Sequence, residues 1–196
     1  MIKILIDSAS DLEKEEADAL GVTLIPMTIR FDNEEFYDGY DLTHREFFKQ
    51  LQLCGELPVT SQINEYRWEE EFEKLTKDGC EVLAITISSE LSGTFACAQK
   101  ASEKFGGKVK LVGKAIGSKK GNNLLMQLVD KCGGVDFDMP YTLAYSGLSD
   151  DNLQKYLKDS AKLWEGKTEN IPSHMIGSTI GTHIGAGAIA VAFFAK

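Results

Sequence analysis

Two stretches of this sequence share one pattern, in which an apolar run ends in a polar turn and the turn opens a helix. Ile2–Ile6 leads into Asp7–Asp11, and Val82–Ile87 leads into Ser88–Thr94. Both runs are nearly continuous in apolar residues, as is typical of strands buried on both faces of a parallel sheet. Strands that alternate with helices constrain this half of the chain to an α/β fold with a parallel sheet.

The segments around these two strands carry start and stop signals for further elements. Thr43 and Glu46 form a capping-box pattern, and Asn64 can cap the next helix. The expected elements are a helix over Leu12–Leu20 capped by Ser10 or Asp11, strands over Val22–Ile25 and Met27–Phe31, a helix from Thr43 through Leu53, a loop over Pro58–Gln62, and helices from Asn64 to about Lys77 and from Ser92 to about Lys104.

The pattern changes after Gly106 and Gly107, where one helix is followed by strand, helix, strand and strand. This order indicates an α+β domain with a mixed or antiparallel sheet. We therefore expect two domains, a parallel α/β domain over 1–110 and an α+β domain over 111–196. The expected elements of the second are helices over Ser118–Cys132 and from Ser149 to about Trp164, and strands over Tyr141–Tyr145, Ile171–Ile176 and Ala188–Phe194, the last two flanking the glycine-rich Gly177–Gly187.

Composition excludes several classes of function. The net charge of −9 leaves no basic surface for a nucleic-acid partner. The four cysteines form no C-x-x-C pair, so we expect neither a metal site nor a disulfide framework. Met1 runs directly into a strand, which leaves no room for a signal peptide, and no apolar run reaches the roughly 18 residues of a membrane span. We expect a cytoplasmic protein without membrane insertion.

The turn over Ser88–Thr94 is the strongest candidate for a binding site. The first N–H groups of the following helix lack intrahelical acceptors, and its dipole favours an anion. Ser92 and Thr94 add side-chain donors. The turn therefore favours binding of a carboxylate or a phosphate.

Three other segments carry residues that can reach a ligand. Because the carboxyl ends of parallel strands share one edge, Asp7 and Ser8 are expected beside the Ser88–Thr94 turn, although both could serve only local capping. Thr60–Gln62 offers three hydrogen-bonding side chains and could equally be an ordinary polar loop. His183 stands between glycines that allow close approach of a ligand or a neighbouring element, and it could be structural or functional.

Together these segments resemble one family. V-T-S-Q at 59–62, S-S-x-L-S-G-T at 88–94 and G-T-H-I-G-x-G at 181–187 are similar to the signature blocks of the DegV family. The opening I-D-S-x-S-D-L at 6–12 and F-x-D-G-x-D-L at 36–42 match in the same order. The resemblance spans both ends of the chain, and the blocks are specific as a set.

The resemblance implies a two-domain cytoplasmic protein that buries one long-chain fatty acid, such as palmitate, stearate or oleate, between its domains. It further implies the lipid-binding, non-catalytic subunit of bacterial fatty acid kinase, in which a separate ATP-using protein phosphorylates the bound carboxylate. By position, Thr60 and Ser92 would hydrogen-bond the carboxylate, and His183 would approach it from the second domain. Ser61, Gly93 and Thr94 would line the head-group site, with no metal and no cofactor besides the fatty acid.

The sequence departs from this family in length. Members run to roughly 280 residues, typical of a two-domain chain, and this chain has 196. Lys108–Val112 passes directly into Gly113–Lys120, which resembles a segment from well inside the second domain. Roughly 80–90 residues are therefore expected to be missing, among them a strand and much of the acyl tunnel wall. A parallel sheet that loses a strand exposes an edge and apolar surface.

Three explanations of the short length stay open: a naturally short member, an engineered deletion, or a printed sequence that skips part of the protein. We favour the second and third, because loss of an internal strand is strongly destabilising. Single positions also differ. Ile63 and Ala186 stand where the family usually has Pro, and Ile116 stands where it usually has Arg, so a charged contact at that loop is not carried over.

Two enzymatic functions and one non-enzymatic function remain open from the residues. Ser92 as nucleophile with His183 as base would give an acyl hydrolase, although no G-x-S-x-G elbow is present. Phosphoryl transfer on His183 is a related alternative, although Gly117–Lys120 does not match a Walker A motif. A regulatory or scaffold protein that holds lipid as structural fill is the third class.

Overall fold

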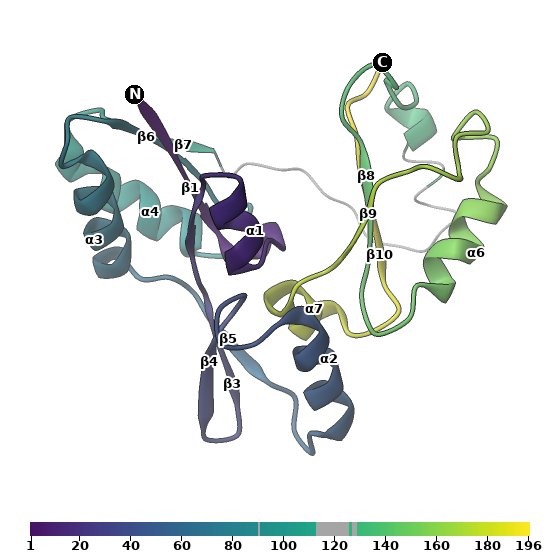
Figure 1. Ribbon diagram of the computed structural model, residues 1–196, viewed down its shortest axis with the longest axis horizontal. Coiled ribbons are helices and arrows are strands. Elements are labelled where there is room, and N and C mark those ends of the chain that lie inside the picture. Colours follow the sequence, from purple (N-terminus) through teal and green to yellow (C-terminus); the bar gives the residue numbers. More distant parts are fainter. Residues whose placement is uncertain (90, 113–125, 127–128) are drawn as a thin grey trace. The chain divides into compact units, whose positions relative to one another are not determined.

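The computed structural model describes residues 1–89, 91–112, 126 and 129–196, which form two compact units (Figure 1). The first unit is Met1–Ile116 with Gly177–His183, and the second is Gly117–Ile176 with Ile184–Lys196. Gly177–His183 thus packs with the N-terminal residues. The division into domains at residue 110 stays a prediction. Most of the helix expected over Ser118–Cys132, and Ile116, lie outside the described residues.

A four-stranded parallel sheet forms the centre of the first unit, as the alternation of strands and helices predicted. Its order is β2-β1-β6-β7, so the first strand lies beside the strand that leads into the Ser88 turn. Every neighbouring pair in it is parallel. The strands are β1 (Ile2–Asp7), β2 (Thr23–Ile25), β6 (Glu81–Ile85) and β7 (Val109–Val112).

Two helices cover one face of this sheet. Leu5 on β1 and Val82 and Ala84 on β6 point into a core that includes Trp68 and Phe72. These two aromatic rings stack with their centroids 5.6 Å apart and belong to α3 (Glu65–Thr76), which packs beside α4 (Thr94–Ser102). A 3₁₀ turn, η2 (Glu103–Phe105), follows α4.

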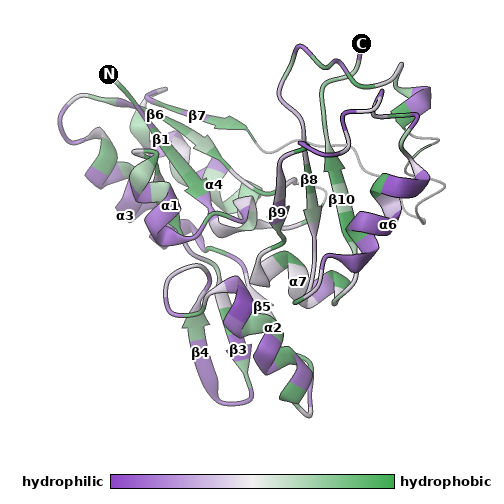
Figure 2. Ribbon diagram, turned by 45° about the vertical axis from the view of Figure 1, so that its right-hand side comes forward, coloured by the Kyte–Doolittle hydropathy of each residue, from purple (hydrophilic) through white to green (hydrophobic). Residues whose placement is uncertain are grey.

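The opposite face of the sheet is only partly covered. Ile6 packs with Ala17 of α1 (Lys14–Ala19). Strand register places Ile4, Ile85 and Val112 on the same face as Ile6, and they are 37%, 39% and 53% exposed. Figure 2 shows β1, β6 and β7 as largely hydrophobic. This face of the sheet therefore carries exposed apolar surface.

A second, antiparallel sheet of the first unit has the order β4-β3-β5. Its strands are β3 (Thr28–Phe31), β4 (Glu34–Tyr37) and β5 (Val59–Ser61). The prediction of a loop over Pro58–Gln62 is therefore wrong for Val59–Ser61, which form a strand. Pairing with β3, which places Thr60 opposite Ile29, turns this segment into an edge strand.

Helix starts in the first unit follow the capping signals in two of three cases. Thr43 and Glu46 form the capping box of α2 (His44–Leu53), and Asn64 accepts the N–H of Arg67 at the start of α3. The cap expected at Ser10 or Asp11 is wrong. Ser8–Ser10 forms the 3₁₀ turn η1, and Asp11 has a left-handed backbone with φ of 62°. The Asp11 carboxylate instead accepts the N–H of Gly177.

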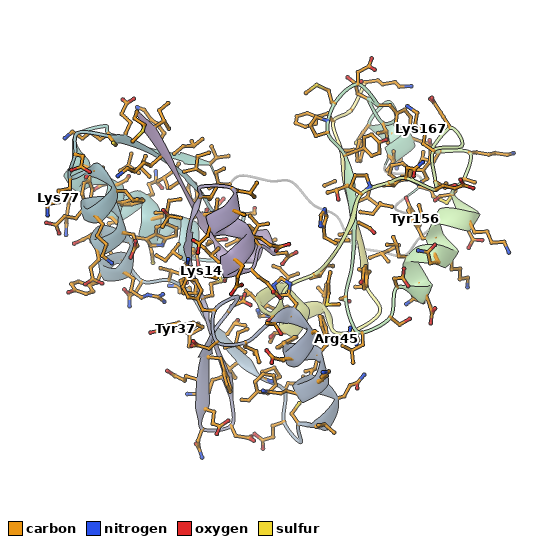
Figure 3. All side chains as sticks on the ribbon, in the orientation of Figure 1. Lys14, Tyr37, Arg45, Lys77, Tyr156 and Lys167 are labelled. Atoms are coloured by element: carbon orange, nitrogen blue, oxygen red, sulfur yellow. The ribbon has the colours of Figure 1, made fainter. Side chains whose placement is uncertain are left out.

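The second unit contains a three-stranded sheet of order β10-β8-β9, in which β10 is antiparallel and β9 parallel to β8. The predicted α+β fold with a mixed sheet is confirmed. Tyr156, labelled in Figure 3, is fully buried with Trp164 and Leu143. The elements are β8 (Thr142–Tyr145), α6 (Asp151–Asp159), β9 (Ser173–Met175) and β10 (Ile189–Ala192), so α6 ends before the expected Trp164.

Candidate functional site

Thr60 and His183 meet although 123 positions separate them in the sequence. Thr60 lies in the edge strand β5, and His183 lies near the end of α7 (Ser178–Ile184). The Thr60 Oγ1 and the His183 Nε2 are 3.0 Å apart. The imidazole is exposed and the threonine half-buried, so the pair is accessible to a ligand.

The start of α4 presents the hydroxyl groups that the sequence suggested. Ser92 Oγ accepts the N–H of Thr94 at 3.2 Å and donates to Thr94 Oγ1 at 3.1 Å. Gly93 is the N-cap residue, and Thr94 is fully buried. The turn is therefore rigid at Thr94, while the half-buried Ser92 and the exposed Gly93 form its accessible part.

Gln62 connects β5 with this turn. Its amide lies so close to Gly93 that a Cβ on Gly93 would overlap Oε1 of Gln62. Its Nε2 also lies 3.6 Å from Sγ of Cys97, one turn further along α4. A side chain at position 93 would therefore require the exposed Gln62 side chain to move. Gln62 stood within a block that the sequence singled out, but the sequence gave it no role in the site.

Asp7 links the two strand ends that the sequence placed at one edge. Its Oδ2 accepts the N–H of Ile87 at 2.7 Å, and its Oδ1 accepts the N–H of Ala9 at 3.2 Å. Burial raises the pKa of Asp7 to about 6, and the hydrogen bonds from Ile87 and Ala9 offset this only in part. Ser8 Oγ accepts the N–H of Met27 in the interior. These two residues hold the edge together and are buried.

The structure groups the predicted site residues in two clusters joined by Gln62. Thr60 and His183 form one, and Ser92, Gly93 and Thr94 form the other. Ser61 is exposed on β5 beside Thr60. The hydroxyl within hydrogen-bond distance of His183 Nε2 belongs to Thr60, whereas Ser92 bonds within its own turn. This arrangement presents hydroxyl and amide donors, as a carboxylate or phosphate requires.

Within residues 1–89, 91–112, 126 and 129–196, no helix combines the length and the hydropathy needed to cross a bilayer. Among the same residues, no group of three or more His, Cys, Asp and Glu side chains is arranged to hold a metal ion.

Sequence comparisons place both ends of the chain in one family. The DegV family model, described as an uncharacterised protein family, matches residues 1–112 and 104–196. A DegV domain-containing protein of Deinococcus radiodurans is 35% identical over 111 residues, which cover 57% of this chain and 40% of that protein. One from Staphylococcus aureus is 34% identical over 109 residues. The chain thus spans about two fifths of the length of these relatives.

Solved structures share the fold at low sequence identity. A DegV family protein from Thermus thermophilus, described as fatty acid binding, has a TM-score of 0.75 at 16% identity and covers all of this chain and 99% of its own. DegV of Bacillus subtilis, described as a fatty acid binding protein, has a TM-score of 0.70 at 18% identity with the same coverage. A stearic acid-binding protein from Eubacterium ventriosum has a TM-score of 0.72 at 16% identity, covering 97% of each chain.

Proposed function

The chain belongs to the DegV family, and we propose that it binds one long-chain fatty acid and holds the carboxylate with the hydroxyl groups of Thr60 and Ser92. Ser61 and Gly93 line this head-group site, the buried Thr94 holds the Ser92 side chain, and His183 supports Thr60. The observation that carries the proposal is the 3.0 Å contact between Thr60 Oγ1 and His183 Nε2. Thr60 lies in β5, and Gln62, directly after this strand, lies beside Gly93 in the Ser92 turn.

The relatives supply the class of ligand. The Thermus and Bacillus proteins are described as binding fatty acids, and the Eubacterium protein as binding stearic acid. Palmitate, stearate and oleate are therefore the ligands to test on this chain. Apolar tail burial contributes about 0.8 kcal/mol per CH₂, so the tail supplies most of the affinity and the head group sets its position.

His183 has a chemical reason to face Thr60. A carboxylate only accepts hydrogen bonds, so Thr60 must donate its hydroxyl hydrogen to it. When His183 Nε2 carries a proton, it donates to Thr60 Oγ1 and leaves that hydrogen free for the ligand. The imidazole thus orients the threonine as a donor, and it needs neither a metal nor a cofactor.

We further propose that the bound fatty acid is presented to a separate ATP-dependent kinase, with no nucleic-acid partner and no membrane insertion. This chain would be the non-catalytic subunit and would work in the cytoplasm, where ATP is available. Formation of acyl phosphate by the kinase should then require the loaded chain. A chain that binds fatty acid but leaves kinase activity unchanged would point to the regulatory or scaffold alternative.

The head-group assignment is tested by Ser92→Ala. Charge-assisted hydrogen bonds contribute roughly 1.5–3 kcal/mol, so loss of the Ser92 hydroxyl should raise the Kd for oleate about tenfold or more. Ser102→Ala is the matched control, because Ser102 lies at the far end of α4 and its hydroxyl donates to the carbonyl of Gln99. Titration of intrinsic fluorescence measures both. An unchanged Kd in Ser92→Ala would remove Ser92 from the site.

The enzymatic alternatives have their own readouts. Turnover of a p-nitrophenyl acyl ester that disappears in Ser92→Ala would indicate a hydrolase with Ser92 as nucleophile. Radiolabel from ATP on His183 would indicate a phosphotransferase. We expect neither, because the hydroxyl that His183 Nε2 faces belongs to Thr60 and not to Ser92.

A further inference from the structure

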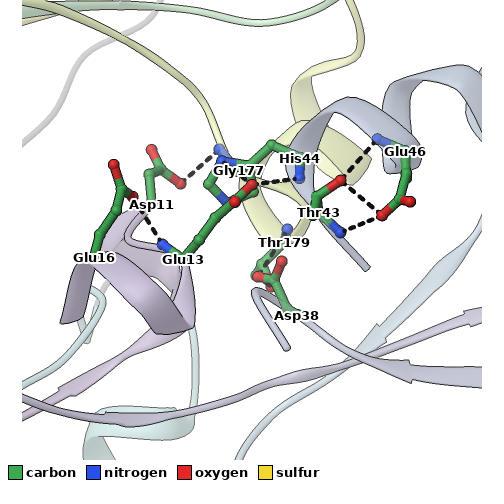
Figure 4. Close-up of polar contacts among 9 residues, drawn as sticks. All are labelled: Asp11, Glu13, Glu16, Asp38, Thr43, His44, Glu46, Gly177 and Thr179. Carbon is green, nitrogen blue, oxygen red and sulfur yellow. Dashed lines mark hydrogen bonds and ion pairs between the residues drawn. The ribbon is translucent and has the colours of Figure 1, made fainter. Parts of the chain in front are cut away.

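The start of α7 is held by two carboxylates from the N-terminal part of the chain (Figure 4). The N–H of Gly177 donates to Asp11 Oδ1 at 2.8 Å. Asp38 Oδ2 accepts both the N–H of Thr179 at 3.3 Å and its hydroxyl at 2.6 Å. These contacts bring a segment from near the end of the sequence onto residues that precede α2.

Because Asp38 is buried, its carboxylate needs hydrogen-bond partners within the protein. Asp38 is fully buried, and Thr179 is 3% exposed. Asp38 Oδ1 has no hydrogen-bond partner among the described residues, so the bonds at Oδ2 carry the stabilisation of this carboxylate. A buried carboxylate in this position is favourable only while Thr179 stays in place.

Close packing fixes the same helix on α2. A Cβ on Gly177 would lie 2.8 Å from His44 Nε2, and one on Gly181 would lie 2.9 Å from Phe48 Cζ and 3.0 Å from Phe47 Cε1. His44 is held in turn by Glu13, whose Oε1 accepts the N–H of His44 at 3.0 Å. Helix α7 therefore has little room to shift along or around its axis.

Helix geometry connects this anchor to the candidate site. Thr179 and His183 are four residues apart, so they lie on the same face of α7. Asp38 directly follows β4, and Thr60 lies in β5, and both strands pair with β3. One face of α7 thus makes two contacts with this part of the chain. Thr179 bonds Asp38, at the end of β4, and His183 contacts Thr60, in β5.

We propose that Asp38 is a positioning residue of the head-group site, acting through Thr179 and α7 on His183. By holding Thr179, Asp38 sets the position of α7 at which His183 Nε2 reaches the Thr60 hydroxyl. The consequence for fatty acid affinity rests on the proposed function, whereas the consequence for His183 does not require any ligand.

The test compares Thr179→Val, which keeps the shape and removes the hydroxyl, with Thr179→Ser, which keeps the hydroxyl. Thr182→Val is the matched control, because the Thr182 hydroxyl donates to the Ser178 carbonyl within α7 itself. NMR of the ligand-free protein follows the His183 ring nitrogens. We expect Thr179→Val to shift the His183 Nε2 signal as Thr60→Val does, and we expect Thr179→Ser and Thr182→Val to resemble the unmodified chain.

Oleate titration gives the second readout. Thr179→Val should raise the Kd about three- to tenfold, in line with the loss of one hydrogen bond, and should add nothing in a Thr60→Val background. Asp38→Ala, which removes the oxygen that accepts both Thr179 bonds, should act in the same direction as Thr179→Val. If the Asp38 variant does not fold, the comparison of Thr179→Val with Thr179→Ser still tests the positioning role.

The outcomes separate the two proposals. An unmodified chain that binds no oleate contradicts the proposed function, while the His183 signal still tests the role of Asp38. Oleate binding with His183 signals unchanged in folded Thr179→Val and Asp38→Ala would overturn the positioning role and leave the proposed function standing.

Discussion

The carboxyl group of Asp7 is 1% exposed at the end of β1, where it joins the strand that leads into the Ser88 turn. Burial raises its pKa from 3.8 to about 6. Between these two values the folded protein binds more protons than the unfolded chain, so stability falls as the pH rises. The loss is complete above about pH 6 and amounts to roughly 3 kcal/mol at 1.36 kcal/mol per pKa unit.

Asp7→Asn should remove this pH dependence. Asparagine carries no charge and keeps a carbonyl oxygen for one of the two backbone N–H groups. We expect the free energy of unfolding at pH 7.5 to rise by roughly 1–3 kcal/mol relative to the unmodified chain, and to match it more closely at pH 4.5. Urea unfolding at both pH values measures this. Asp78→Asn, at a side chain 79% exposed, is the control. A pH slope that persists in Asp7→Asn would refute the assignment.

At the scale of the element, helix α7 is stabilised by contacts with residues that are distant in the sequence. Its sequence, S-T-I-G-T-H-I, is rich in residues of weak helix propensity. Gly181 faces the rings of Phe47 and Phe48, both buried on α2. Glycine serves here because two helices approach closely, and an added side chain has no free space.

Gly181→Ala should therefore destabilise the protein by about 1–3 kcal/mol, because the two buried rings must move to admit a methyl group. Gly55→Ala is the matched control, since a Cβ on Gly55 meets nothing within 4 Å and its φ is not positive. Thermal unfolding followed by circular dichroism compares the variants. Equal stability of the two variants would show that the rings tolerate the methyl group without cost.

The elements also show how far sequence reasoning reaches. Helices α2 and α3 were predictable because Thr43, Glu46 and Asn64 act within one turn of the chain. Strand β5 and helix α7 were not, because β5 depends on pairing with β3 and α7 depends on Asp38 and α2. The contact between Thr60 and His183 depends on both β5 and α7. The sequence motifs therefore identified these two residues, but local patterns could not predict that their side chains lie within hydrogen-bond distance.

At the scale of the whole molecule, the parallel sheet exposes apolar surface on one face. Ile4, Ile85 and Val112 lie on that face and are more than a third exposed. Parallel sheets are normally covered on both faces, and exposed apolar patches promote association. The chain spans about two fifths of the length of the relatives that it matches.

This surface should be detectable in solution. We expect the chain to bind the apolar dye ANS and to self-associate with rising concentration. Ile85→Thr combined with Val112→Thr should lower both effects while changing the free energy of unfolding by less than about 1 kcal/mol, because both positions are partly solvated. Leu20→Thr, at the exposed C-cap residue that follows α1, is the control. Dye fluorescence that does not fall in the double variant would mean that another surface binds ANS.

Fatty acid binding by this chain is decided by native mass spectrometry after incubation with oleate. We predict one bound oleate per chain, with much lower occupancy in Ser92→Ala and unchanged occupancy in Ser102→Ala. A chain that carries no fatty acid as purified and takes up none from excess oleate would contradict fatty acid binding.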